Sequence, residues 1–243
     1  MTDVRAAVRD LVVRAVGDPS ATGTIVAAVE QHVADLPGPE QDAVLVDAFR
    51  AVRPYTAAWL RGHGATPEQA ADSTADVDRK LDRYGLRGTG LDWFCAVLTA
   101  RVVTVGRLQF ELGDTQPDGR PAWGVHVPET GPLDPEACDR SFASAPPVLR
   151  ALAPEHAADH WQCRSWILDP GLPDVLGPDA NLVRFARRFR LSPPGPDDER
   201  EGDADVTKFV LGPSAGGRLA EAVRARLDSG GHWTVRSGTA PVR

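Results

Sequence analysis

Hydrophobic positions recur at helical spacing through the first hundred residues. In the opening MTDVRAAVRDLVVRAV, apolar residues return every three or four positions, and Thr2 is a suitable N-cap. Pro54 predicts a break or kink near Arg53 within one of the later helices, because proline removes a backbone donor and clashes with the preceding turn. The same period predicts further helices over residues 24–36, 41–60, 66–84 and 91–100.

The pattern changes to strand-like segments near residue 100. Residues 101–111 and 122–127 are typical of strands, and Pro117-Asp118-Gly119 between them supplies the turn chemistry of an antiparallel hairpin. Asp134 then caps a helix that has Pro135 at its first position. The rest of the chain is expected to hold strands at 163–168, 206–211 and 232–235, a helical turn at 172–176, mixed signals at 182–191, a loop at 193–205 and a Ser214-capped helix to about residue 227.

This order of elements predicts two domains and an α/β (α+β) fold. Residues 1–95 form an all-helical N-terminal domain, and residues 96–243 form a mixed sheet with flanking helices. The capping box formed by Thr66 and Gln69 marks one helix start in the first domain, and Gly85 marks the expected end of that helix.

Composition narrows the class of protein. A hydrophobic content of 42% with 25% charged residues is ordinary for a globular protein. The net charge of −7 argues against a nucleic-acid partner, which needs a basic footprint. The N-terminus has no apolar core typical of a signal peptide, and no apolar run approaches the ~20 residues of a membrane span. Three widely spaced cysteines indicate a reducing cytoplasm, and the excess of arginine over lysine suggests a GC-rich bacterial genome.

Several motifs in the second half resemble those of a bacterial family of acyltransferase-like proteins. The residues that carry the resemblance are RLQF at 107–110, HVP at 126–128, CRSWILD at 163–169, NLVRF at 181–185 and GGHW at 230–233. Members of that family join a helical N-acyltransferase domain to a C-terminal domain of GNAT-like fold. The resemblance implies transfer of an acyl group from a thioester, on CoA or an acyl carrier protein, to an amine of a small molecule. It implies no metal and no tightly bound cofactor, and biosynthesis is the expected role.

Two residues are candidates for handling the proton in such a reaction. His126 lies at the end of a predicted strand, where the fold exposes its reaction centre, and an imidazole titrates near neutral pH. Glu111 lies at the end of the RLQFE strand and could orient or deprotonate an amine. The alternatives are a histidine hydrogen-bonded at a strand end, and a glutamate that is solvated or paired with Arg107.

The loop PETGPLD at 128–134 takes the position at which a GNAT fold binds the pyrophosphate of CoA. Thr130 and Gly131 are its candidate binding residues. The loop departs from the usual glycine-rich pattern, because it carries two prolines and the acids Glu129 and Asp134. Acids beside a helix N-terminus repel a pyrophosphate, so weak affinity for free CoA is expected. The alternatives are a carrier-protein donor, or a non-catalytic binding or assembly module that has lost the donor site.

Cys163 invites a second chemistry, in which its thiol acts as a nucleophile or acyl carrier with a nearby histidine as base. Packing in the core is the favoured interpretation, because free cysteine is among the most buried residue types. His156 and His160 have the i, i+4 spacing of metal ligands on a helix, but the segment lacks a further ligand and no metal site is expected.

Overall fold

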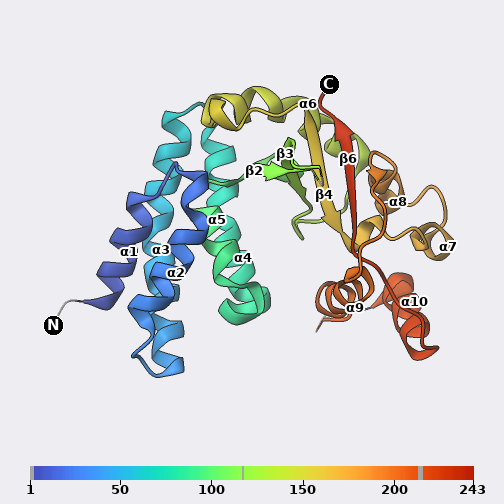
Figure 1. Cartoon of the computed structure of the whole chain (residues 1–243), viewed down its shortest axis with the longest axis horizontal. Helices are drawn as coiled ribbons and strands as arrows, with labels where there is room; N and C mark the ends of the chain where they lie inside the picture. Colours follow the sequence, from blue (N-terminus) through green and yellow to red (C-terminus); the bar gives the residue numbers. More distant parts are fainter. Residues whose placement is uncertain (1–2, 117, 213–215) are drawn as a thin grey trace. The chain divides into compact units, whose positions relative to one another are not determined.

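The computed structural model describes residues 3–116, 118–212 and 216–243. The chain divides into two compact units (Figure 1). Unit 1 is Met1–Gly113 together with Ser144–Ala157, and unit 2 is Asp114–Ala143 together with Ala158–Arg243. Both units are therefore discontinuous in sequence.

Unit 1 is built mainly from helices, as the periodic pattern predicts. Phe49 and Phe94 lie at the centre of its core, with their rings 5.6 Å apart, and aliphatic side chains from the surrounding helices pack in the same cluster. The elements are α1 (Val4–Arg14), a 3-10 turn (Pro19–Ala21), α2 (Thr22–Val33), α3 (Gly38–Gly62), α4 (Pro67–Thr89) and α5 (Leu91–Leu98).

The helix starts and stops of unit 1 test the sequence signals directly. The capping box at α4 is confirmed, since Thr66 Oγ1 accepts from Gln69 N and Gln69 Oε1 accepts from Thr66 N. The regular backbone of α4 is interrupted at Gly85 (φ 69°), and a further helical stretch continues to Thr89. Asp3 caps α1, whereas the expected cap Thr2 lies outside the described residues.

Of the break or kink expected near Pro54, the break does not occur, because α3 continues through this residue. Pro54 has no N–H, so a backbone carbonyl in the preceding turn loses its hydrogen-bond donor. Because Pro54 is exposed, this carbonyl lies on the solvent side of the helix. The buried residues of α3 lie before and after the proline, and their packing holds one helix across it.

A mixed sheet follows, with strand order β1-β2-β3-β4-β6-β5. Its strands are β1 (Val102–Val105), β2 (Leu108–Thr115), β3 (Pro121–His126), β4 (His160–Ser165), β5 (Arg190–Leu191) and β6 (Arg236–Pro241). The segment 101–111 is not one strand, because Gly106 (φ 63°) turns the chain and β1 pairs with β2 in antiparallel register. The turn after β2 is confirmed by hydrogen bonds from Gly119 N to Gln116 O and from Gln116 N to Arg120 O.

The helices after β3 include the largest departure from the sequence prediction. Residues expected to form a loop and a strand form one helix, α9 (Asp198–Phe209), and the last strand begins at Arg236 instead of His232. The expected strand 163–168 ends at Ser165 and continues as a 3-10 turn. The helices are α6 (Pro135–Leu152), α7 (Leu172–Leu176), α8 (Asn181–Ala186), α9 and α10 (Gly217–Asp228); the expected cap Ser214 of α10 lies outside the described residues.

The part of the sheet in unit 2 has one apolar and one polar face. β4 lies beside β6, and Figure 1 shows α8 on the side of β6 away from β4, with α7 beyond α8. On the apolar face, Trp161 contacts Trp123 and Phe142, and Phe142 stacks near Phe185 of α8. The opposite face, called here the polar face, is formed by alternate residues of the same strands: Gly124, His126, Gln162, Arg164 and Thr239.

Candidate active site

The candidate site lies where the paired stretch of the parallel strands β3 and β4 ends. Their register covers two residue pairs, Trp123 with Trp161 and Gly124 with Gln162. β3 nevertheless continues to His126 and β4 to Ser165. The ends of the two strands beyond this register are called here the opening, and backbone amides and carbonyls that are not used in strand pairing can bind an extended ligand.

His126 occupies the end of β3 on the polar face of this opening. Its side chain is partly buried. It follows Gly124 by two residues, so its Cα lies roughly 7 Å further along the strand on the same face. The expectation that His126 ends a strand is confirmed, and its role as a base stays a prediction.

Gln162 shares the polar face with His126 and was not anticipated from the sequence. It lies opposite Gly124 on β3 and opposite Thr239 on β6. Gln162 is 7% exposed, and its Oε1 has no hydrogen-bond partner among the described residues. The only signal in the sequence was an amide in the middle of an apolar strand, and the sequence does not show that its oxygen is unpaired.

Glu111 belongs to β2 in unit 1, and its side chain forms an ion pair. Arg101 Nε lies 2.7 Å from Glu111 Oε1, and both side chains are mostly buried. The arginine that the sequence suggested as its partner was Arg107, whereas this contact comes from the residue just before β1. The carboxylate thus has a protein partner at the end of the β1–β2 hairpin.

Cys163 lies on the apolar face, opposite to the side that carries His126. Its neighbours in the strand, Gln162 and Arg164, point to the polar face, while Cys163 shares its side with Trp161. The thiol is 2% exposed, and burial, with a smaller contribution from Asp114, raises its pKa to about 12. A nucleophile needs the thiolate and a base within reach. The arrangement therefore favours packing over catalysis for Cys163.

The loop after β3 leads to the N-terminus of α6. Asp134 Oδ1 accepts from Ala137 N at 2.8 Å, so the predicted cap is confirmed. Thr130 and Gly131 are exposed in this loop, and Gly131 has a φ of 117°, which other residues rarely adopt. The pair is accessible to a phosphate group, and its binding role stays a prediction.

The segment from His156 to His160 is not a helix. His156 ends a 3-10 turn and His160 begins β4, so the two imidazoles do not share a helical face as expected. His160 Nδ1 lies 2.7 Å from Asp159 Oδ1. Among the described residues, no cluster of three or more potential ligands for a metal ion is found.

Asp169, which ends the CRSWILD motif, has a structural role. Its carboxylate accepts hydrogen bonds from Gly171 N, Thr234 N and Thr234 Oγ1 at 2.7–2.8 Å, and it pairs with Arg226 Nη1 at 3.3 Å. With 1% of its side chain exposed, it ties the turn after β4 to α10 and to the segment before β6. The motif thus supports the strands that form the site.

Comparison with known proteins identifies the fold. The family model for the GNAT-like C-terminal domain matches residues 102–240. A solved acyltransferase in complex with decanoyl-CoA has a TM-score of 0.79 and 25% identity, over 99% of this chain and 77% of that one. An acyltransferase in complex with decanoyl-CoA and teicoplanin has a TM-score of 0.73 and 28% identity, over 89% and 76%. An acyltransferase variant in complex with octanoyl-CoA has a TM-score of 0.74 and 29% identity, over 89% and 75%.

No curated protein matches the chain. In the described parts of the sequence, no helix combines the length and apolar character needed to cross a membrane. The match of residues 102–240 covers more than half of the 243 residues and includes β3, β4 and the opening between them. The chain therefore belongs to the family of proteins that carry the GNAT-like C-terminal domain.

Proposed function

We propose that this protein transfers an acyl group from acyl-CoA to an amine of a small molecule. The observation that carries the proposal is the pairing of β3 and β4 over two residues only, with His126 at the end of β3. Further support comes from similar acyltransferases, whose complexes contain decanoyl-CoA, octanoyl-CoA and teicoplanin.

The chemistry requires little from the protein beyond position and one proton acceptor. The amine nitrogen attacks the thioester carbonyl carbon, an N–C bond forms, and the C–S bond breaks. His126 takes the proton that the nitrogen loses, and the departing thiolate of CoA gains a proton, so the products are an amide and free CoA thiol. Backbone amides beside the opening between β3 and β4 are the proposed donors to the oxyanion.

The donor is proposed to be CoA, because the similar acyltransferases were solved with CoA thioesters. Thr130 and Gly131 would contact its pyrophosphate. The acids of this loop, Glu129 and Asp134, still predict modest affinity for CoA, and Asp134 already caps α6. The acyl and pantetheine parts must then contribute most of the binding energy. An acyl carrier protein is the alternative donor.

Glu111 and Cys163 take secondary places in this proposal. Glu111 is already paired with Arg101, so we give it no part in the proton transfer. Cys163 would line the core behind the site. A reducing, cytoplasmic setting agrees with the three cysteines, Cys95, Cys138 and Cys163, all of which are buried free thiols. A bacterial source and a biosynthetic role are proposed from the sequence resemblance.

The acidic loop favours one alternative function, a binding or assembly module of the same fold without turnover. The two functions are separated by incubating the protein with decanoyl-CoA and teicoplanin. Transfer should release CoA thiol and produce acylated teicoplanin in equal amounts, measured with a thiol reagent and by mass spectrometry. Release of no thiol with teicoplanin or with simple amines, although decanoyl-CoA binds, would favour the module.

His126→Gln tests the proposed base. The variant keeps a hydrogen-bonding side chain but loses the titrating imidazole, so kcat should fall at least ~100-fold while the melting temperature stays within a few degrees. His32→Gln is the matched control, because His32 is exposed on α2 and its ring bonds its own helix through Ala28 O. Unchanged kcat in His126→Gln, or an early melting transition with normal kcat, would remove the base role.

A further inference from the structure

The polar face contains a buried amide that the proposed reaction does not yet use. Gln162 is more than nine-tenths buried, and the oxygen of its side chain makes no hydrogen bond within the described parts of the chain. A buried carbonyl without a donor destabilises a folded protein, because the group has lost its bonds to water and gained none in return. Such a cost can be retained at a functional site, where a ligand supplies the missing donor.

The position of Gln162 points to the substrate as that ligand. It lies in the last residue pair of the β3–β4 register, and the residue opposite it on β3 is Gly124, which has no side chain to supply a donor. His126 lies on the same face, one strand repeat beyond Gly124. The amide is thus placed beside both the opening and the proposed base.

The other side of Gln162 does not satisfy its oxygen either. Thr239 is its partner on β6 and carries a hydroxyl, yet Gln162 Oε1 has no bond to it. Arg164, two residues further along β4, is held by Asp198 at 3.3 Å and by Glu201 at 2.5 Å, so its guanidinium is turned toward α9. The strand neighbours on the polar face therefore leave the oxygen of Gln162 as an acceptor.

We infer that Gln162 is a substrate-binding residue whose Oε1 accepts a hydrogen bond from a substrate N–H. This inference rests on the proposed acyl transfer, and it names the chemistry that the site recognises. Two substrate groups have such a donor: the amine of the acceptor, and the amides of the pantetheine arm of CoA. In either case the hydrogen bond would hold the reacting groups beside His126.

Replacing Gln162 with methionine is predicted to raise the stability of the free protein and to weaken substrate binding. Gln162→Met has a similar shape and lacks the buried unpaired oxygen, so the free protein should melt a few degrees higher. The same variant should raise the KM of one substrate about tenfold with a smaller change in kcat, because one hydrogen bond to that substrate is lost. A purely structural glutamine would instead lower the melting temperature when it is replaced.

Gln116→Met is the matched control. Gln116 is also a buried glutamine of unit 2 with an unpaired Nε2, but its Oε1 accepts from Arg120 in the hairpin turn. It should leave both KM values unchanged. KM is measured with decanoyl-CoA and teicoplanin varied in turn, and the affinity for decanoyl-CoA is measured by calorimetry without an acceptor.

The outcomes separate the two sources of the N–H group. A raised KM for teicoplanin alone assigns the bond to the acceptor, and weaker binding of decanoyl-CoA assigns it to pantetheine. Unchanged KM values and unchanged decanoyl-CoA affinity in Gln162→Met would overturn the inference. Failure of the wild-type protein to acylate any amine would contradict the proposed function, and the calorimetric comparison of the two proteins would still test Gln162.

Discussion

At the scale of single residues, burial sets the chemistry of the three cysteines. Burial raises the pKa of the Cys95 and Cys163 thiols to about 12, and Cys138 is fully buried. A thiol with this pKa is ionised to only about one part in ten thousand at pH 8, and the thiolate is the reactive form. Iodoacetamide at pH 8 should therefore leave the folded protein unmodified, as measured by intact mass.

Unfolding in urea provides the control for the cysteine prediction. The denatured chain should gain three adducts at the same reagent concentration, because all three cysteines are free. A single rapid adduct at Cys163 in the folded protein, accompanied by loss of acyl transfer, would revive the nucleophile hypothesis. Cys163→Val should otherwise retain its activity, since the side chain shares a face with Trp161 and not with His126.

The sequence predicts the role of a residue when that role depends on neighbours close in the chain. The cap residues Thr66 and Asp134 were predictable because a cap bonds its own helix within three residues. His126 was predictable as a strand end from its neighbours. Gln162 was not, because its importance depends on residues of β3 and β6 that are distant in sequence. Cys163 could not be assigned to a face of the sheet before the strand register was known.

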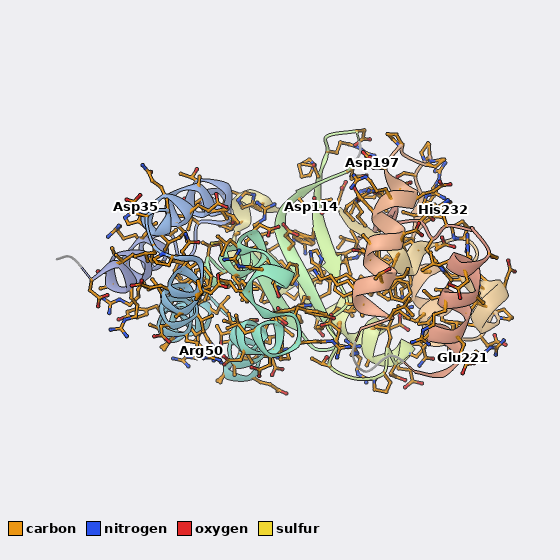
Figure 2. The ribbon with its side chains drawn as sticks, turned by 90° about the horizontal axis from the view of Figure 1, so that it is seen from below. Asp35, Arg50, Asp114, Asp197, Glu221 and His232 are labelled. Atoms are coloured by element: carbon orange, nitrogen blue, oxygen red, sulfur yellow. The ribbon has the colours of Figure 1, made fainter. Side chains whose placement is uncertain are left out.

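At the scale of elements, α9 forms in a segment whose composition predicts a loop. Residues 193–205 are acidic and begin with prolines, which is typical of a loop, yet α9 starts at Asp198. The acids of its first turn suit the helix dipole, and Asp198 also accepts from Gly195 N and pairs with Arg164. Asp203, further along the helix, accepts from Trp233 N and lies 2.7 Å from Nδ1 of His232, which is labelled in Figure 2. These contacts across the chain stabilise a helix that local propensity does not favour.

Gly202 on α9 permits the closest approach in this region. A Cβ at this position would lie 2.2 Å from Trp233 O and 2.5 Å from Thr234 Cα, and both are backbone atoms that cannot rotate away. Gly202→Ala should therefore destabilise the protein by about 1–3 kcal/mol or more, the usual cost of overpacking. Urea unfolding followed by circular dichroism measures the change.

Gly23 on α2 is the matched control for Gly202. It is also helical, but a Cβ there would meet nothing within 4 Å. Gly23→Ala should stabilise the protein by roughly 0.5–1 kcal/mol, because alanine loses less backbone entropy on folding. Equal effects at the two positions would show that α9 does not pack closely on the Trp233 segment.

At the scale of the whole molecule, the family and the fold class predicted from sequence are confirmed, and so is the prediction of an acyltransferase at the level of its relatives. The motifs that indicated the family lie mostly in β2, β4, α8 and the segment before β6. The proposed division at residues 95 and 96 rests on a change of hydrophobic period, which marks where helices give way to strands. A change of secondary structure and the end of a core are separate features, so the division stays a prediction.

The composition of unit 1 predicts that the chain cannot be cut at residue 95. Val102 of β1 belongs to the same core cluster as Phe49 and Phe94, and Thr104 N donates to Ser73 Oγ of α4. Unit 1 also includes Ser144–Ala157, where Ala151 lies against Gly64. A fragment of residues 96–243 would lose the partners of β1 and of this segment, so it should aggregate or show no cooperative unfolding by calorimetry. A soluble fragment that unfolds cooperatively would instead establish residues 96–243 as an independent domain. The compact units would then not be the units that fold independently.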